Sequence, residues 1–152
     1  MKRILVIGHL GQDGKLLGTR LRDEGHEVFG LGRNGVENLS IRNGAKISLE
    51  NAESIKKLIK VARPDEVYFL AAYHNASEDS LPDDAELFRM SFETNTAALV
   101  NVLEALKIYA PKASLFYASS SQIFGLPRSW PQDENTRVSP TTIYGISKAA
   151  GM

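Results

Sequence analysis

The stretch that decides the fold is ILVIGHLGQDG, residues 4–14. Its first four residues form a continuous apolar run, which is the pattern of a strand buried on both faces of a sheet. Three glycines follow in a G-x-x-G-x-x-G spacing: Gly8, Gly11 and Gly14. A helix is predicted next, over residues 16–24, with Gly25 as its C-terminal stop. A strand, a glycine turn and a helix in this order predict the first unit of an α/β fold.

Strands and helices alternate along the rest of the chain. Further strands are predicted at residues 26–31, 45–47, 66–70 and 114–117, further helices at residues 51–62 and 85–109 and from residue 141 onward, and irregular segments at residues 35–43 and 125–140. This order predicts a Rossmann-type doubly wound parallel sheet, with right-handed crossovers and helices on both faces. Because no linker or repeat divides the chain, residues 1–152 are predicted to be one domain.

Composition excludes several classes of partner. The 18 Lys and Arg residues balance 18 Asp and Glu residues, so bulk charge favours neither nucleic acid nor an acidic membrane surface. The chain has no cysteine, which excludes disulfides, and its histidines lack a carboxylate at a metal-binding spacing, so no metal is expected. No apolar run approaches the roughly 18 residues of a membrane span. The expectation is a cytoplasmic protein.

The glycine turn lies where open α/β sheets bind ligands. Glycine permits a positive φ, lets backbone N–H groups approach a pyrophosphate, and lets the helix pack closely on the strand. A purely structural turn would also use glycine, but its position directly after a buried strand favours a dinucleotide.

The end of the second predicted strand indicates which dinucleotide. An acidic side chain there would accept hydrogen bonds from the adenosine ribose and favour NAD, but this chain has Gly32 and Arg33. A guanidinium pairs well with a phosphate dianion, so Arg33 predicts NADP. The alternative is an arginine in an exposed turn that contacts only water.

Tyr144 and Lys148 are four residues apart in the last predicted helix, and so share one face of it. The ammonium is expected to lower the pKa of the phenol from about 10 toward neutrality. Such a tyrosine can exchange a proton with a sugar hydroxyl or carbonyl while hydride moves to or from nicotinamide. The lysine can also hold the nicotinamide ribose. An ordinary helix surface can show the same spacing.

Serines follow the strand predicted at residues 114–117. The sequence ASSS, residues 118–121, then lies at the carboxyl edge of the sheet, where the nicotinamide is expected. A serine hydroxyl there can hydrogen-bond the reacting oxygen, or it can simply cap a loop. The three motifs occur in one order: the glycine turn, the serines and then the Tyr-x-x-x-Lys pair. Together they indicate a dinucleotide-dependent active site more specifically than any one of them does alone.

With these motifs the sequence resembles the extended short-chain dehydrogenase/reductases, the NAD(P)-dependent epimerase/dehydratase family, and within it the GDP-mannose 4,6-dehydratases. The similar stretches are GHLGQDGKLL (8–17), RPDEVYFLAA (63–72), Asn95, YASSSQIFG (117–125) and PQDENTRVSPTTIYGISKAA (131–150). They cover most of the chain in the family's order. The resemblance implies an NAD(P)-binding Rossmann domain over residues 1–152.

The resemblance also implies roles for individual residues. Ser120 matches the catalytic Ser/Thr, Tyr144 the acid/base and Lys148 its partner lysine. The implied cofactor-binding positions are Gly8, Gly11, Gln12, Asp13 and Gly14 in the pyrophosphate turn, Arg33 as the NADP-selecting arginine, Ser48 near the adenine, Leu70, Ala71 and Ala72 along the cofactor, Asn95 as a brace, and Tyr144 and Lys148 themselves.

One departure bears on the reaction. The dehydratases carry a glutamate two residues after the catalytic Ser/Thr, where it removes the C5 proton, but this chain has Gln122, an amide without useful basicity. The resemblance therefore implies an NADP-dependent enzyme that reduces or epimerises a nucleotide-diphosphate keto sugar. Two alternatives stay open: a non-catalytic NADP-binding module, or a GDP-mannose 4,6-dehydratase in which Glu78, Asp79 or another acid supplies the base.

Members of the family continue for roughly as much sequence again, with the last strands of the sheet and a substrate domain. The resemblance implies that these parts are absent from this chain, which ends four residues after Lys148, within the catalytic helix. The 152 residues alone are therefore expected to be inactive. Family members dimerise through the long helix and the catalytic helix, so a homodimer or higher homo-oligomer is expected.

Overall fold

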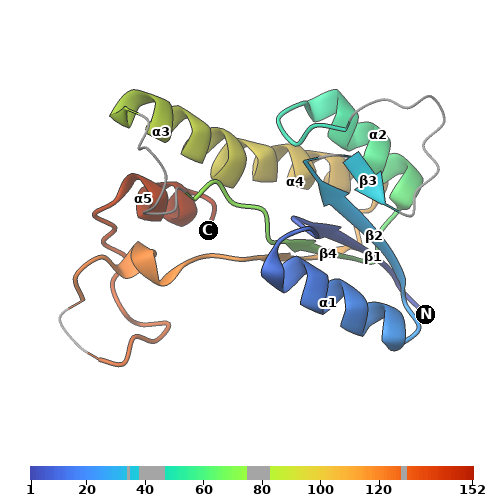
Figure 1. Cartoon of the computed structure of the whole chain (residues 1–152), viewed down its shortest axis with the longest axis horizontal. Helices are drawn as coiled ribbons and strands as arrows, with labels where there is room; N and C mark the ends of the chain where they lie inside the picture. The colour runs from blue at the N-terminus through green and yellow to red at the C-terminus, as the bar shows by residue number, and fades with distance from the viewer. Residues whose placement is uncertain (34, 38–46, 75–82, 128–129) are drawn as a thin grey trace. The chain divides into compact units, whose positions relative to one another are not determined.

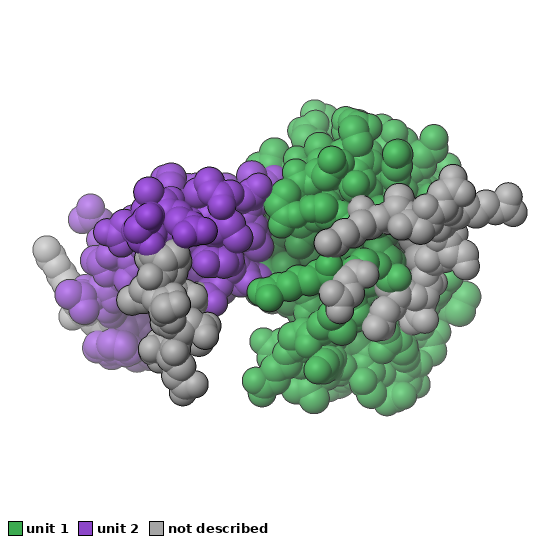
Figure 2. Space-filling view, turned by 45° about the horizontal axis from the view of Figure 1, so that its top comes forward, with its two compact units in different colours: residues 1–71, 98–118 green, residues 72–97, 119–152 purple. Residues whose placement is uncertain are grey.

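The computed structural model of the chain describes residues 1–33, 35–37, 47–74, 83–127 and 130–152. The chain divides into two compact units, coloured separately in Figure 2. Unit 1 comprises residues 1–71 and 98–118, and unit 2 comprises residues 72–97 and 119–152. Unit 1 contains the β-sheet, whereas unit 2 is built from helical segments and the loops that join them.

Within its described residues, unit 1 has a five-stranded sheet with the strand order β3-β2-β1-β4-β5 (Figure 1). The strands are β1 (Arg3–Ile7), β2 (Glu27–Gly32), β3 (Gly35–Glu37), β4 (Glu66–Phe69) and β5 (Ser114–Tyr117). Strands β2, β1, β4 and β5 run parallel, and β3 is antiparallel to β2. The predicted Rossmann-type sheet is confirmed, with one antiparallel strand added at its edge.

Helices cover both faces of this sheet. Helix α1 (Gln12–Asp23) covers one face, and α2 (Ala52–Ala62) and α4 (Ala98–Tyr109) cover the other. Side chains of a strand alternate between the two faces. In β1, Ile4 and Val6 pack on the α1 side, whereas Leu5 and Ile7 join the larger core formed with α2 and α4. Burial on both faces explains why the strands have continuous apolar runs.

Helix α2 shows how local sequence sets the ends of an element. The Asn51 side chain caps its start by accepting a hydrogen bond from the Ser54 N–H at 2.8 Å. The helix ends where Arg63 takes a left-handed conformation, with φ 41°, directly before Pro64, because proline disfavours the helical conformation in the residue before it. Its fully buried apolar side chains are Ile55, Leu58, Ile59 and Ala62. Truncation of Leu58 to alanine would destabilise unit 1 by about 2–5 kcal/mol.

Two predicted boundaries in unit 1 were wrong. Helix α1 begins at Gln12 rather than at residue 16, because Gly11 serves as its N-cap and the polar residues after it form the first turn. The segment 35–43 was predicted to be irregular, but residues 35–37 form β3 and pair with β2. Residues 38–43 lie outside the described residues, as do residues 45 and 46 of the strand predicted at 45–47. The remaining residue of that strand, Ile47, is buried but lies outside any strand.

Unit 2 contains helix α3 (Asp84–Phe92), the π-helical segment η1 (Glu93–Ala97), the 3-10 helix η2 (Ser121–Phe124) and helix α5 (Ile143–Ala150). The single helix predicted over residues 85–109 is instead three consecutive helical segments: α3, η1 and α4. Single π-helical turns within α-helices occur frequently at functional sites. Among the described residues, no helix is long and apolar enough to cross a membrane.

Candidate cofactor-binding and active site

The glycine turn lies at the carboxyl end of β1, in unit 1. Gly8 has φ 91°, and its N–H donates to the Leu31 carbonyl at 2.8 Å, which fixes the turn against β2. A Cβ at residue 8 would lie 2.7 Å from the backbone nitrogen of Ala71, two residues beyond the end of β4. Both the positive φ and the lack of space require glycine at this position.

The other two glycines act differently. A Cβ on Gly14 would lie 2.3 Å from the Gly8 carbonyl oxygen, so this glycine allows the first turn of α1 to pack on the turn. Gly11 is exposed, and as the N-cap it leaves the first N–H groups of α1 without a side-chain cap. Gln12 and Asp13 follow as exposed residues in that first turn. Uncapped N–H groups at a helix start are suited to an anion such as a pyrophosphate.

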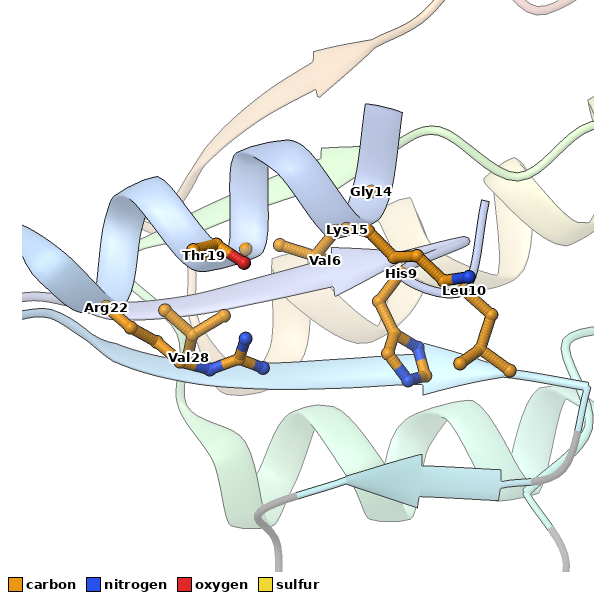
Figure 3. Close-up of a pocket in the computed structure, with 9 residues that line it drawn as sticks. Val6, His9, Leu10, Gly14, Lys15, Thr19, Arg22 and Val28 are labelled. Carbon is orange, nitrogen blue, oxygen red and sulfur yellow. The ribbon is translucent and has the colours of Figure 1, made fainter. Parts of the chain in front are cut away.

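His9, within the turn, is buried against β2. A Cβ on Gly30 would lie 2.5 Å from the imidazole Cδ2, and one on Gly32 would lie 2.9 Å from its Cε1, so both glycines make room for the ring. Beside it lies a hollow of about 190 Å³, also lined by Lys15 and Arg22 (Figure 3). Ligand pockets are commonly about 300–1,000 Å³, so this hollow is too small for a dinucleotide.

Three further predicted cofactor positions lie at the same edge of the sheet as the glycine turn. Arg33 follows β2 and is exposed. Leu70 follows β4 and donates its N–H to the Ile7 carbonyl at 2.9 Å, and Ala71 comes next, against Gly8. Unit 1 therefore brings these residues together at the ends of adjacent parallel strands. Ser48 lies in the turn before α2, where its hydroxyl bonds the Glu50 carboxylate.

Tyr144 and Lys148 lie one turn apart on α5, in unit 2. The Lys148 Nζ is 5.9 Å from the centroid of the Tyr144 ring. The lysine is 1% exposed, and burial lowers its pKa to about 8. Burial raises the pKa of Tyr144. The predicted lowering of this pKa was wrong, because desolvation of the phenolate outweighs the attraction of an ammonium at this distance.

Asn95 lies in η1, is fully buried, and hydrogen-bonds both Tyr73 and Ser147. Its Oδ1 accepts from the Tyr73 N–H at 2.8 Å, and its Nδ2 donates to the Tyr73 carbonyl at 3.3 Å and to the Ser147 hydroxyl at 2.9 Å. The Ser147 hydroxyl in turn donates to the Tyr144 carbonyl at 2.8 Å. Asn95 thus joins the segment of Ala72 and Tyr73 to α5, a geometry that suits its predicted role as a brace.

His74 contacts the candidate acid/base directly. Its ring meets the Tyr144 ring edge-on, with the centroids 4.8 Å apart and an interplanar angle of 87°. The Asn95 bonds to the preceding residue hold this part of the backbone in place. The sequence interpretation considered His74 only as a metal ligand, and no spacing in the sequence predicted the ring contact. Among the described residues, no three His, Asp or Glu side chains converge as a metal site.

Ser120 is the N-cap of the 3-10 helix η2, and its hydroxyl accepts the Gln122 N–H at 3.2 Å. The Gln122 Oε1 accepts the Thr142 hydroxyl at 2.8 Å, and Thr142 Oγ1 accepts the Gly145 N–H at 3.0 Å as the N-cap of α5. Sequence reasoning missed Thr142 and Ser147. A threonine directly before a helix is a recognisable cap, so Thr142 could have been found.

The chain matches the model of the NAD dependent epimerase/dehydratase family over residues 4–152. It therefore belongs to this family. GDP-mannose 4,6 dehydratase 1 of Arabidopsis thaliana is 32% identical to it, over 98% of this chain and 45% of the relative. UDP-glucose 4-epimerase of Mycolicibacterium smegmatis is 30% identical, over 98% of this chain and 49% of the relative.

A solved structure is similar over the same extent. The Thermus thermophilus UDP-glucose 4-epimerase, in complex with NAD, has a TM-score of 0.77 and 27% identity, over 97% of this chain and 48% of that one. The chain thus spans about half the length of the relatives that it matches.

Proposed function

We propose that this chain carries the cofactor-binding and catalytic residues of an NADP-dependent enzyme that reduces or epimerises a nucleotide-diphosphate keto sugar. The observation that carries the proposal is the buried Lys148 beside the half-buried Tyr144 on α5. Family membership supports the enzyme class. Relatives named for GDP-mannose and UDP-glucose support the class of substrate.

The residues of unit 1 fit a dinucleotide. Gly8 and Gly14 leave no space for a Cβ, and the uncapped start of α1 offers N–H groups to a pyrophosphate. The exposed guanidinium of Arg33 is the group proposed to bind the 2′-phosphate of NADP. In unit 2, Lys148 is proposed to hold the nicotinamide ribose. The bound nicotinamide would supply or take up hydride.

The protein's own side chains would handle the proton. Because burial raises the pKa of Tyr144, its phenol keeps the proton at neutral pH and can donate it to a carbonyl oxygen, as reduction requires. Lys148, with a pKa of about 8, is mostly charged at pH 7 and would stabilise the negative charge that develops on the phenol oxygen. The Ser120 hydroxyl is proposed to hydrogen-bond the same substrate oxygen.

Reaction type depends on position 122. Dehydration requires a base for the C5 proton, and the Gln122 amide cannot serve as one. The dehydratase alternative is favoured by the Arabidopsis relative and needs a substitute such as Glu78 or Asp79, both outside the described residues.

We expect little turnover from the 152 residues alone, so the test uses a polypeptide that carries this chain at its relatives' length. Incubated with GDP-mannose, it should form little 4-keto product, which is measured by its absorbance in alkali. Abundant product would contradict the proposal. Loss of keto-sugar turnover in Tyr144→Phe would exclude the non-catalytic module.

Cofactor choice is tested by Arg33→Ala. The substitution should weaken NADP binding by about 1–3 kcal/mol, the range for a lost charge-assisted hydrogen bond, and leave NAD binding nearly unchanged. Titration calorimetry with both dinucleotides measures this. Equal losses for the two would assign Arg33 no part in selectivity.

A homodimer is also proposed. Helix α4 exposes three apolar side chains, Val100, Leu103 and Ile108, by 45–55% each. Such a stripe on a helix is suited to packing against a second copy. Light scattering of a polypeptide that carries this chain at its relatives' length, at micromolar concentration, should give a dimer mass or larger. Leu103→Glu should reduce that mass to the monomer's, and a monomeric wild-type polypeptide would contradict the proposal.

A further inference from the structure

Gln122 makes contacts with both of its neighbouring segments in unit 2. Its backbone N–H donates to the Ser120 hydroxyl at 3.2 Å, and its carbonyl accepts the Gly125 N–H at 3.3 Å, so its backbone belongs to the Ser120 turn. Its side chain reaches away from that turn, where Oε1 accepts the Thr142 hydroxyl at 2.8 Å. These contacts join two segments that are 20 residues apart in sequence.

In the hydrogen bond between Thr142 and Gln122, the threonine hydroxyl is the donor. The Thr142 oxygen already accepts the Gly145 N–H at 3.0 Å, so its own proton is available for the Gln122 oxygen. The backbones are also in close contact, because a Cβ on Gly145 would lie 2.6 Å from the Gln122 carbonyl oxygen. The first turn of α5 therefore lies directly on the Gln122 backbone, and Tyr144 belongs to that turn.

We propose that Gln122 is a positioning residue that joins the Ser120 turn to the start of α5 and so sets where Tyr144 lies relative to Ser120. The inference rests on the proposed function and explains how the site keeps its geometry without a base at position 122. The joining contact uses only a hydrogen-bond acceptor, which either an amide or a carboxylate supplies. Glutamine therefore preserves the contact while it removes basicity.

The test compares two substitutions of similar size in the free 152-residue protein. Gln122→Met removes the acceptor, and Gln122→Glu retains it. In Gln122→Met, hydrogen exchange of the Gly145 amide should become about threefold to tenfold faster, the range for one lost hydrogen bond. The ring resonances of Tyr144, and the midpoint of its titration, should shift as well. In Gln122→Glu the Gly145 exchange rate and the Tyr144 resonances should stay close to those of the wild type.

The amide of Ser54, which Asn51 caps in α2, serves as the internal reference and should exchange at the wild-type rate in both variants. Thr142→Ser keeps the hydroxyl and should behave like the wild type, whereas Thr142→Val should accelerate Gly145 exchange at least as much as Gln122→Met does. Wild-type exchange at Gly145 in Gln122→Met, or equal effects of the Met and Glu variants, would overturn the proposal. Because no cofactor or turnover enters these measurements, their failure is distinct from failure of the proposed function.

Discussion

The two units hold their candidate site residues by different means. In unit 1 the backbone forms the site: strand ends, a turn with positive φ, and glycines that leave no room for a further atom. In unit 2 side chains form it, through Asn95, Ser147, Thr142 and Gln122. Added atoms should therefore damage unit 1, and removed polar atoms should damage unit 2.

The largest expected effect tests the backbone site of unit 1. Gly14→Ala would place a Cβ 2.3 Å from the Gly8 carbonyl oxygen, and backbone cannot move aside as a flexible side chain can. We expect the free energy of unfolding to fall by about 3 kcal/mol, the upper end of the usual range for overpacking, together with loss of dinucleotide binding. Urea denaturation and calorimetric titration measure the two effects.

Gly18→Ala is the matched control, because it lies in the same helix and its Cβ would have its nearest contact at 3.5 Å, on the Arg22 side chain. It should stabilise the protein by about 0.5–1 kcal/mol, since alanine favours a helix over glycine. Equal stabilities of the two variants would mean that the turn can relax around an added methyl group.

The second effect concerns the buried charge in unit 2. The pKa of Lys148 is about 8 in the folded protein and 10.5 in the unfolded chain. Between these two pH values the unfolded state binds more protons, so this group makes the free energy of unfolding rise with pH. Below about pH 8 the lysine is charged in both states, and the full cost of burying its charge lowers the stability of the fold. Lys148→Met should therefore stabilise the protein at pH 7, by up to about 3 kcal/mol. Its stability should rise less than that of the wild type between pH 8 and 10, and parallel curves would contradict the prediction.

Much of unit 1 could be predicted from the sequence because its signals are local. A strand buried on both faces produces a continuous run such as residues 4–7, and the glycine spacing after it has a direct steric cause. Strand β3 was missed because it has three residues and no apolar pattern of its own. It exists because β2 offers it an edge to pair with, which is a tertiary effect.

The site of unit 2 could be predicted only in part. The spacing of Tyr144 and Lys148 was visible, because residues four apart share a helix face. The direction of the Tyr144 pKa was not, since burial depends on surroundings that no spacing encodes. The bond from Asn95 to Ser147 spans 52 residues, and only the folded chain brings the two together.

A smaller effect tests the side-chain network of unit 2. Asn95→Leu leaves the Tyr73 backbone groups and the Ser147 hydroxyl without the partner that Asn95 provides. We expect the free energy of unfolding to fall by about 2 kcal/mol, as when buried polar groups are left without hydrogen bonds. Asn101→Leu is the matched control, because its amide donates to the Leu49 carbonyl at 3.2 Å from a half-buried position, and it should cost under about 1 kcal/mol. Equal losses of unfolding free energy for the two variants in urea denaturation would show that the buried network contributes no more to stability than the half-buried contact does.

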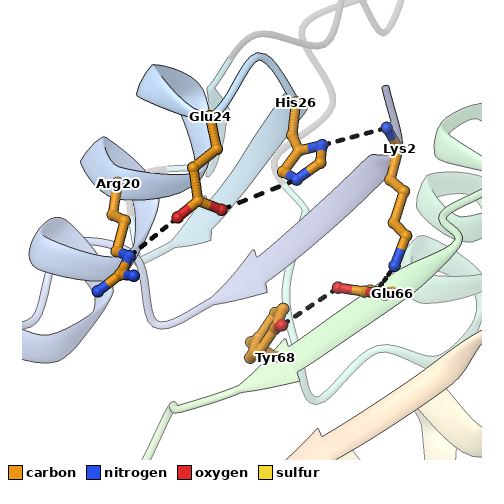
Figure 4. A network of polar contacts seen from close by, with 6 residues as sticks. All are labelled: Lys2, Arg20, Glu24, His26, Glu66 and Tyr68. Carbon is orange, nitrogen blue, oxygen red and sulfur yellow. Dashed lines mark hydrogen bonds and ion pairs between the residues drawn. The ribbon is translucent and has the colours of Figure 1, made fainter.

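The smallest effect concerns a second polar network, which lies in unit 1 and is partly exposed to solvent (Figure 4). Lys2 Nζ lies 2.5 Å from the Glu66 carboxylate, and the Tyr68 hydroxyl donates to the same carboxylate at 3.1 Å. The hydrogen bond from Lys2 holds the pKa of Glu66 below its usual value. Water and salt screen such a pair, so Glu66→Gln should cost under about 1 kcal/mol at pH 7.

The sign of its pH dependence follows from the lowered pKa of Glu66. The stabilisation is present above the carboxyl's unfolded-state pKa and is lost as pH falls through the folded one, so the difference between Glu66→Gln and the wild type should disappear in acid. Added salt should reduce the difference too, whereas the loss in Asn95→Leu should not respond to salt, because no charge is involved. Urea denaturation at low and high ionic strength measures the loss of stability in each of the two variants. A loss for Glu66→Gln that persists in salt and equals that of Asn95→Leu would show that exposure does not separate the two networks.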